Sequence, residues 1–395
     1  MKTIPFLEFG GDYLGHKIRD VRLFILDVRL QEPFAISFKT FTHAENFLVV
    51  VETEDGLVGY GEGAPFKPIT GDSREEALDF AKRVAKELKG FTFTDVREVH
   101  EALNKIGNEL GFTSQTVLAA IDMAIYDILG KSKNVPVYKI LGAEKPHLVP
   151  NTLTIGIKPI DKTVESAKKL MSDFKENGLK RIKLKLSGDL KSDIERVLAV
   201  AKVFPGEFTL DANQGYKDPE DAVKLVKKLY NELGDRIILL EEPCPKGDIE
   251  KMKYVKDRSE IPIFADESAA TVEDARRVAE AGAADGINIK LQKAGGIYYG
   301  LKIAEIAKEH NLKLMVGCML ETGISIAAGI HFATAIKEVI NTDLDSDLTL
   351  GINILKEIHP FKDGCRVPLE APGLGIEPLE IIKNIINEDL RLLKA

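Results

Sequence analysis

Five charged residues recur at nearly even spacing in the second half of the chain, and their types suit proton transfer beside a metal ion. They are Lys185, Asp211, Glu241, Asp266 and Lys290, separated by 26, 30, 25 and 24 residues. Each ends or closely follows a short apolar run typical of a buried strand. About 25 residues is enough for one strand, one helix and two loops of an α/β barrel, whose chemistry lies at the carboxyl ends of the strands. The spacing therefore predicts an active site of three carboxylates flanked by two lysines.

The three carboxylates indicate a bound cation, because acids gathered at one barrel mouth repel one another unless a positive charge neutralises them. Oxygen ligands favour a hard divalent ion, above all Mg²⁺. No Cys or His stands at these positions, which argues against zinc. The alternative is that each acid caps the helix that follows it. Glu242 directly follows Glu241, and spacing alone does not decide which of the two binds metal.

The segment 181–186 alternates charged and aliphatic residues, as a strand with two unlike faces does. Lys183 and Lys185 share one face, and three aliphatic residues share the other. The alternative is an exposed edge strand with solvated lysines, since buried ammonium groups are costly. If both lysines point into the barrel, each lowers the pKa of the other. Lys185 is then suited to act as a general base near neutral pH.

The elements that would position these residues follow from hydrophobic periodicity. Amphipathic segments at 161–176 and 219–233 predict helices between strands, and Asp218 and Asp248 stand where helix N-caps are expected. A loop rather than a helix is expected after the eighth strand, which leaves seven strand–helix units and a final strand. The eight strands are expected to begin near Thr152, Arg181, Glu207, Arg236, Pro262, Gly286, Lys313 and Val339.

The first part of the chain has a different pattern. Strands are expected at 21–28 and 46–52, with a hairpin turn at 54–56, and helices at 74–89 and 113–129. The fold class is therefore α/β, a modified TIM barrel of the (β/α)7β type with an α+β capping domain. We expect a capping domain at 1–148, a catalytic barrel at 149–358 and a segment at 359–395 that packs back on the capping domain.

Composition excludes several classes of protein. The 395 residues carry a net charge of −8 and no basic tract, which argues against nucleic acid as a partner. No run of about 18 apolar residues predicts a membrane span, and the N-terminus has no signal-peptide core. Three scattered cysteines are too few for a disulfide framework. These features predict a cytoplasmic protein.

Taken together, these residues resemble the enolase superfamily and, within it, the muconate-lactonising subgroup. The resemblance covers about residues 20 to 375. In the barrel it rests on Lys183 and Lys185, Asp211 and Asn213, Glu241 and Pro243, Asp266 and Glu267, and Lys290. In the first domain it rests on the segments 61–65, 69–72 and 120–124, which read Gly-Glu-Gly-Ala-Pro, Ile-Thr-Gly-Asp and Ala-Ile-Asp-Met-Ala.

The resemblance implies roles for these residues. Mg²⁺ would be held by Asp211, Asp266 and, of the two neighbouring glutamates, Glu241. The metal would bind the substrate carboxylate and stabilise the enediolate formed when the α-proton leaves. Lys185 and Lys290 would stand on opposite faces of the α-carbon, one removing the proton and the other returning one. Lys183 would hold the substrate carboxylate and lower the pKa of Lys185.

A second acidic pair suggests which member of the subgroup the chain resembles. Asp343 and Asp345 end the eighth predicted strand, where alternation puts them on one side, about 6.6 Å apart. The pair resembles the Asp-x-Asp signature of dipeptide epimerases, where it binds the α-ammonium of the N-terminal residue. Asp347 continues the alternation, so the alternative is an acidic, solvated loop.

Two further segments are expected to contact the substrate. Cys318, Met319, Leu320 and Glu321 follow the seventh strand and would line the pocket, with Cys318 as a small packing residue rather than a nucleophile. The segment 33–40 resembles the mobile specificity loop of the family. Its Lys39 would attract an acidic side chain on the C-terminal residue, as in Ala-Glu, although it lacks the guanidinium fork of Arg. The alternative is that Lys39 is a solvated loop lysine.

The function that follows is a Mg²⁺-dependent dipeptide epimerase that inverts the α-carbon of the C-terminal residue by two-lysine 1,1-proton transfer. The alternatives within the superfamily are an N-acylamino-acid racemase, an o-succinylbenzoate synthase or a muconate cycloisomerase, whose substrates lack the α-ammonium. An alternative from a different functional class is a non-catalytic binding protein built on a barrel that has lost its enzymatic activity. The expected partners are a small dipeptide and further copies of the chain in a homo-oligomer, with neither nucleic acid nor membrane.

Overall fold

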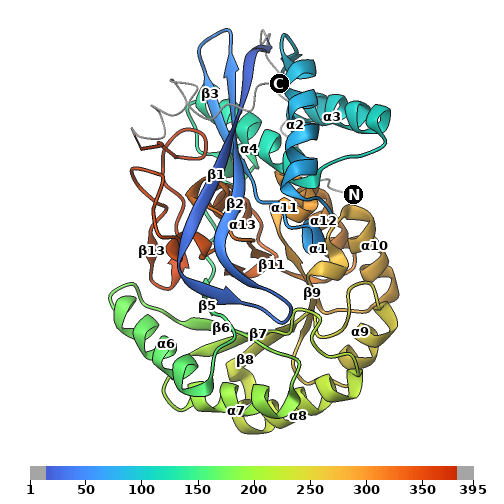
Figure 1. Ribbon diagram of the computed structural model, residues 1–395, viewed down its shortest axis with the longest axis vertical. Helices are drawn as coiled ribbons and strands as arrows, with labels where there is room; N and C mark the ends of the chain where they lie inside the picture. The colour runs from blue at the N-terminus through green and yellow to red at the C-terminus, as the bar shows by residue number, and fades with distance from the viewer. Residues whose placement is uncertain (1–14, 380–395) are drawn as a thin grey trace.

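The computed structural model describes residues 15–379, in which an antiparallel sheet and its helices lie beside a parallel sheet curved into a barrel (Figure 1). Consecutive barrel strands pair in parallel, and a bridge between Asn151 and Thr342 brings the last strand to the first. Each strand begins within one residue of its predicted start. The strands are β5 (Thr152–Ile155), β6 (Arg181–Lys185), β7 (Glu207–Asp211), β8 (Ile237–Glu241), β9 (Ile263–Ala265), β10 (Gly286–Ile289), β11 (Lys313–Gly317) and β12 (Val339–Asp343).

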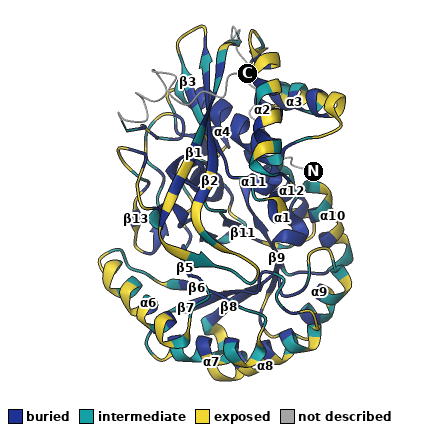
Figure 2. Ribbon diagram, viewed as in Figure 1, coloured by how far each residue is buried: buried dark blue, intermediate teal, exposed yellow. Residues whose placement is uncertain are grey.

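Helices connect these strands and cover the barrel, and several of them turn exposed faces outward (Figure 2). Asp218 and Asp248 cap two of them as predicted, accepting from the backbone N–H groups of Glu220 and Lys251. Within the described residues, no helix longer than the 3-10 turn η3 (Ser346–Leu348) follows β12, so the prediction of seven units and a final strand is confirmed. The helices are α6 (Ile160–Asp173), α7 (Leu190–Ala201), α8 (Pro219–Leu233), α9 (Ile249–Lys256), α10 (Val272–Ala281), α11 (Leu291–Ala294), α12 (Ile297–Glu309) and α13 (Gly323–Ala335).

The barrel interior is polar over much of its height. Outward-facing aliphatic residues of β6 join the large core beneath the helices, whereas Lys183 on the opposite face is fully buried. Leu239, Phe264 and Met315 form a separate small apolar cluster. TIM barrels commonly fill this space with branched aliphatic side chains. Here the apolar core lies mainly between sheet and helices, which leaves the interior for charged groups.

The antiparallel part contains β1 (His16–Ala35), β2 (Thr40–Thr53), β3 (Val58–Gly63) and β4 (Thr92–Phe93), ordered β3-β2-β1-β4. The long hairpin of β1 and β2 reaches the barrel and exceeds the predicted strands at both ends (Figure 1). The two predicted helices are present as α2 and α4, whereas α1, α3 and α5 were not predicted. The helices are α1 (Lys67–Thr70), α2 (Arg74–Leu88), α3 (Val96–Leu110), α4 (Gln115–Ser132) and α5 (Val137–Ile140).

Buried carboxylates of the antiparallel part fasten it to the barrel. Glu62 accepts from Thr322 N and Oγ1 (2.9 and 2.6 Å) and from Ser325 N (3.2 Å), at the N-terminus of α13. Asp122 accepts from the N–H groups of Ile297 and Tyr298 (2.6 and 3.1 Å), at the start of α12. An anion at a helix N-terminus is stabilised by the unpaired N–H groups there. The two parts are therefore held in a fixed relation by directional contacts.

The described end of the chain contacts the same region. Leu374 donates its N–H to Asp127 of α4 (2.9 Å), and Val137 donates to Gly373 O (2.9 Å). Residues 380–395 of the predicted C-terminal segment lie outside the described residues, and the boundaries predicted for the three parts stay predictions. No helix within 15–379 is long and apolar enough to cross a membrane.

Close packing of β3 on α4 gives a test of this arrangement. A Cβ on Gly61 would lie 1.8 Å from Ala120 O. We expect Gly61→Ala to lower the free energy of unfolding by about 3 kcal/mol, because β3 must move away from α4. Urea unfolding measures this loss. Gly56→Ala is the control, since its Cβ meets open space and only its positive φ of 87° is strained, at a cost of about 1 kcal/mol. Equal losses would contradict the packing argument.

Candidate active site

The structure brings the three predicted metal ligands together at the carboxyl ends of β7, β8 and β9. Asp211, Glu241 and Asp266 are fully buried, and each offers a carboxylate oxygen within 4.8 Å of the others. Their donor set is entirely oxygen, which suits a hard divalent cation. Glu242 is turned away from this group, since it accepts from the N–H of Asp266 (2.8 Å) and Ser268 (3.2 Å). Glu241 therefore belongs to the group and Glu242 does not.

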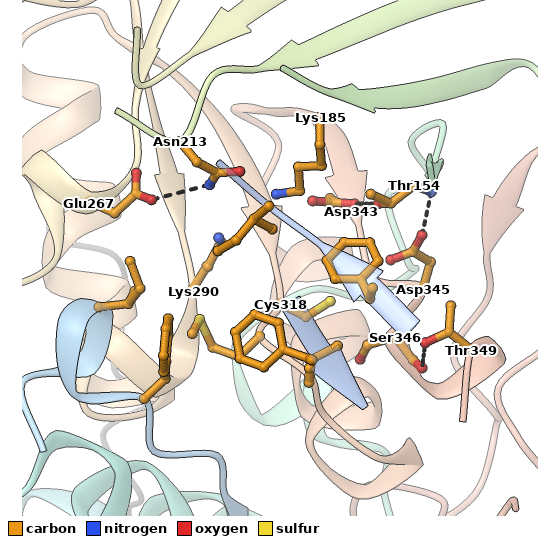
Figure 3. A pocket seen from close by; sticks show the side chains of 17 residues that line it. Thr154, Lys185, Asn213, Glu267, Lys290, Cys318, Asp343, Asp345, Ser346 and Thr349 are labelled. Atoms are coloured by element: carbon orange, nitrogen blue, oxygen red, sulfur yellow. Dashed lines mark hydrogen bonds between the residues drawn. The ribbon is translucent and has the colours of Figure 1, made fainter. Parts of the chain in front are cut away.

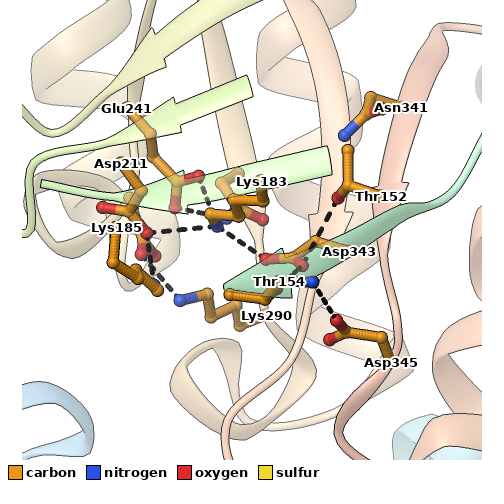
Figure 4. A network of polar contacts seen from close by, with 12 residues as sticks. Thr152, Thr154, Lys183, Lys185, Asp211, Glu241, Lys290, Asn341, Asp343 and Asp345 are labelled. Carbon is orange, nitrogen blue, oxygen red and sulfur yellow. Dashed lines mark hydrogen bonds and ion pairs between the residues drawn. The ribbon is translucent and has the colours of Figure 1, made fainter. Parts of the chain in front are cut away.

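The lysines point at these acids (Figure 4). Lys183 Nζ lies 2.6 Å from Asp343, 2.8 Å from Glu241 and 3.1 Å from Asp211. Lys185 Nζ lies 2.5 Å from Asp211 Oδ2. The lysines are buried in the barrel, so the alternative of an exposed edge strand is wrong. Because each ammonium meets a carboxylate, the group is a network of ion pairs.

This network changes the pKa values in a direction that the lysine spacing did not predict. Burial lowers the pKa of Lys183, but the charges of Asp343, Glu241 and Asp211 outweigh it and raise that pKa well above the usual value. Burial is likewise outweighed at Lys290, where Asp266 and Glu241 raise the pKa. Lys183 does lower the pKa of Lys290, as expected of a neighbouring ammonium group, but the carboxylates outweigh that effect.

The pKa values of Asp211, Glu241 and Asp266 are shifted in different directions. Lys185 and Lys183 overcome the effect of burial at Asp211 and lower its pKa to about 2. Lys290 and Lys293 do the same at Asp266, whose pKa lies well below its usual value. Burial and the charge of Asp211 raise the pKa of Glu241 to about 8. Four lysines contact these three acids, so the three converging carboxylate oxygens, rather than uncompensated charge, are what favour a divalent cation.

Two residues of this network were missed from the sequence. Lys293 on α11 contacts the Asp266 carboxylate and lies 2.6 Å from Asp266 O, and Lys290 contacts the other carboxylate oxygen at 2.7 Å. Asn288 donates to Glu241 Oε1 (2.7 Å). Strand alternation places Asn288 on the same face as Lys290 and could have identified it. Lys293 lies beyond the strand, where alternation gives no signal.

Asp343 and Asp345 line one side of the cavity that Lys185 and Lys290 also line (Figure 3). Thr154 on β5 positions both, since its Oγ1 donates to Asp343 (2.9 Å) and its N–H donates to Asp345 (2.6 Å). Asp347 instead pairs with Arg366 at 2.9 and 2.7 Å. All three acids are buried, at 4, 6 and 8% exposure, so the alternative of a solvated acidic loop is wrong. Thr154 carried no sequence signal that marked it as functional.

Of the four residues expected after the seventh strand, three line this cavity. They are Cys318, Met319 and Leu320. Burial raises the pKa of Cys318 well above its usual value, in keeping with a packing role. Glu321 is turned away, accepting from Met319 N (2.6 Å) and from the Ser325 hydroxyl. It therefore shapes the loop and does not line the cavity.

Lys39 is also absent from the cavity wall within the described part of the chain. Its Nζ lies 4.7 Å from the ring centroid of Phe41 and 4.6 Å from that of Phe66. Both rings belong to the cavity wall. Cation–π contacts of this kind hold an ammonium against aromatic faces. The position does not support the expected role of Lys39 as an anchor for an acidic substrate side chain.

Comparison with known proteins places both parts of the chain in one group. The mandelate racemase/muconate lactonizing enzyme N-terminal domain matches residues 18–142, and the enolase C-terminal domain-like family matches residues 163–382. A hydrophobic dipeptide epimerase of Enterococcus faecalis is 35% identical, over 91% of this chain and 99% of that protein. An L-Ala-D/L-Glu epimerase of Clostridium acetobutylicum is 33% identical, over 91% and 98%. The crystal structure of a dipeptide epimerase from Enterococcus faecalis V583 with Mg and L-Leu-L-Tyr has a TM-score of 0.83 and 33% identity, over 91% and 99%.

Lys183 is expected to be the most costly lysine of the network to remove. Lys183→Met leaves three buried carboxylates without their common partner, so we expect the free energy of unfolding to fall by about 4 kcal/mol. Urea unfolding without divalent cations measures the loss. Lys185→Met is the matched control, because Lys185 contacts a single carboxylate and lines the cavity. A smaller loss for Lys183→Met than for Lys185→Met would contradict the arrangement.

Proposed function

The chain belongs to the mandelate racemase/muconate lactonizing enzyme family of the enolase superfamily, and from this premise we propose that it is a Mg²⁺-dependent dipeptide epimerase. The observation that carries the proposal is a single cavity lined by Lys185, Lys290, Asp343 and Asp345. Two bases flanking one carbon and a carboxylate pair for an ammonium group are what epimerisation of a dipeptide requires. The reaction inverts the α-carbon of the C-terminal residue.

The metal would be held by Asp211, Glu241 and Asp266, whose buried oxygens fit such an ion. When bound, Mg²⁺ supplies positive charge that offsets these acids and stabilises negative charge developing on the substrate carboxylate. Lys293 and Asn288 keep two of the ligands in place through their contacts with Asp266 and Glu241.

The two cavity lysines perform the proton transfers. Lys185 ends β6 and Lys290 follows β10, so three strands separate them around the barrel. A substrate α-carbon between them presents one face to each Nζ. One lysine, as the neutral amine, takes the α-proton, and the other, as the ammonium, donates a proton to the opposite face. The configuration is thereby inverted, and each lysine serves as base for one stereoisomer.

Lys183 has a different role in this proposal from the one its sequence position implied. It is fully buried and does not line the cavity within the described residues. Its contacts are with Asp343, Glu241 and Asp211. We therefore propose that Lys183 fixes the position of Asp343 relative to the metal ligands Glu241 and Asp211, rather than binding the substrate carboxylate.

Asp343 and Asp345 separate this function from its alternatives. Substrates of N-acylamino-acid racemases, o-succinylbenzoate synthases and muconate cycloisomerases have no α-ammonium. Asp343 pairs with Lys183, whereas Asp345 accepts from the backbone N–H of Thr154, so Asp345 is the buried carboxylate that such substrates would leave without a cationic partner. Named relatives act on hydrophobic dipeptides and on Ala-Glu, so family membership does not fix the side chains. A cytoplasmic location and assembly into a homo-oligomer remain part of the proposal. The described cysteines are all free, in keeping with a reducing compartment.

Replacement of either base tests the two-lysine mechanism. We expect Lys185→Ala and Lys290→Ala each to lower epimerisation by about 10³-fold or more. Each variant should still exchange the α-proton of the one diastereomer that faces its remaining lysine. Mass spectrometry in D₂O measures exchange, chiral chromatography measures inversion, and circular dichroism verifies the fold. Inversion at a normal rate in either variant would rule out this mechanism.

Substrate binding should depend on pH through Asp345. Burial and the neighbouring Asp343 raise the pKa of Asp345 to about 7. The neutral acid dominates below that pH and cannot pair with an ammonium, so dipeptide affinity should increase as pH rises through about 7. Calorimetric titration with a dipeptide measures this, and an N-acetylated dipeptide is the control. Asp345→Asn should remove this pH dependence. An unchanged profile in Asp345→Asn would assign the titration to another group.

A further inference from the structure

The substrate side chains that the cavity accepts depend on the lining residues other than the two lysines and the two aspartates. Lys185 and Lys290 are committed to the α-carbon, and Asp343 and Asp345 to the ammonium. The apolar part of the remaining wall comes mainly from the β1–β2 hairpin, the segment before α1 and the loop after β11, and the polar part includes Asn213, Glu267 and Ser346. The apolar side chains include Phe34, Ile36, Phe41, Phe66, Met319 and Leu320.

No cation within the described residues remains in this wall to pair with an acidic substrate side chain. Lys185 and Lys290 are the two basic residues that line it. Lys39 lies instead against the rings of Phe41 and Phe66. It lines a neighbouring hollow, which shares Phe41, Phe66, Met319 and Leu320 with the cavity wall. A carboxylate entering the cavity would be desolvated without a partner, which is costly. An apolar side chain gains free energy from the same burial.

A second cavity continues from the first, past Asp345. It has a volume of about 550 Å³. Phe34, Thr154, Asp345 and Thr349 line both cavities. The ammonium site therefore stands at the junction, and the side chain of the N-terminal residue has the second cavity beside it. The apolar residues that line only the second cavity include Leu30, Leu153, Ile155, Leu170 and Phe174.

The charged groups at the second cavity are already paired. Lys158 Nζ lies 2.5 Å from Glu32 Oε1 and 3.1 Å from the Ser166 hydroxyl. Lys169 lies 3.3 Å from Asp173. Neither pair leaves an uncompensated charge for a substrate side chain. The second cavity therefore has room for a large side chain, and its apolar residues lie beside these paired charges.

We infer that the substrates are dipeptides with a large apolar residue at both positions. The side chain of the epimerised C-terminal residue occupies the wall of Phe41, Phe66 and Leu320, and that of the N-terminal residue occupies the second cavity. This inference rests on the proposed function, and it replaces the acidic preference that Lys39 suggested.

Four dipeptides separate the two positions. L-Leu-L-Leu, L-Ala-L-Leu, L-Leu-L-Glu and L-Ala-L-Glu are compared by α-proton exchange in D₂O with Mg²⁺, giving kcat/KM for each. We expect Leu at the C-terminal position to be favoured over Glu by about 100-fold, and Leu over Ala at the N-terminal position by about tenfold. Equal or greater kcat/KM for the Glu dipeptides would overturn the inference while leaving the proposed function intact.

Exchange of none of the four dipeptides, in a protein shown by calorimetry to bind Mg²⁺, would contradict the proposed function itself. The two failures are therefore distinguishable, because the first changes the ranking and the second abolishes the reaction.

Two wall variants test the individual positions. Ile36→Arg adds a cation to the first cavity and should raise the ratio of L-Leu-L-Glu to L-Leu-L-Leu kcat/KM by about tenfold. Ile36→Met is the matched neutral control and should leave the ratio unchanged. Leu170→Trp fills part of the second cavity and should slow L-Leu-L-Leu by about fivefold relative to L-Ala-L-Leu. An unchanged ratio in Ile36→Arg or Leu170→Trp would contradict the corresponding subsite.

Discussion

Burial of three carboxylates within a few ångströms of one another is the constraint on which the rest of this structure depends. Asp211, Glu241 and Asp266 have no exposed surface, so solvent cannot screen their repulsion. The negative charge is compensated by four lysines, each of which contacts at least one of the three acids: Lys183, Lys185, Lys290 and Lys293. The lysines that compensate the buried carboxylates in the folded protein therefore include the two that are proposed to transfer protons.

The four lysines have different roles according to how deeply each is buried. Lys183 and Lys293 are almost completely enclosed and fix carboxylates, whereas Lys185 and Lys290 reach the cavity. Such a site needs a rigid frame, because an ion pair at a buried position is favourable only with good geometry. The frame comes from the apolar layer between strands and helices and from the buried acids that join the two parts. Glu62 is one of these, and it holds the start of α13, next to the loop that lines the cavity.

Specificity is built from elements of the two parts together. The barrel contributes the reacting groups and the ammonium site, while the β1–β2 hairpin and the segment before α1 contribute aromatic side chains. The wall can therefore change its preferred side chain without disturbing the lysines or the metal ligands. This separation offers a physical reason why proteins similar to this one carry names with different dipeptides.

The sequence by itself determined the barrel, its strand positions and the convergence of its charged residues. These follow from local properties: a period of two within each strand, apolar runs at regular intervals, and the rule that parallel strands end at one edge. It also predicted that Asp343 and Asp345 lie on one side, and both line the cavity although β12 ends at Asp343. Only the tertiary structure decided that carboxylates raise the pKa of Lys183. It also decided that Asp347 is buried against Arg366 and that Lys39 lies against two aromatic rings. Each of these depends on partners far away in the chain. No local pattern encodes which distant groups surround a charge, and that surrounding sets both its pKa and its access to the cavity.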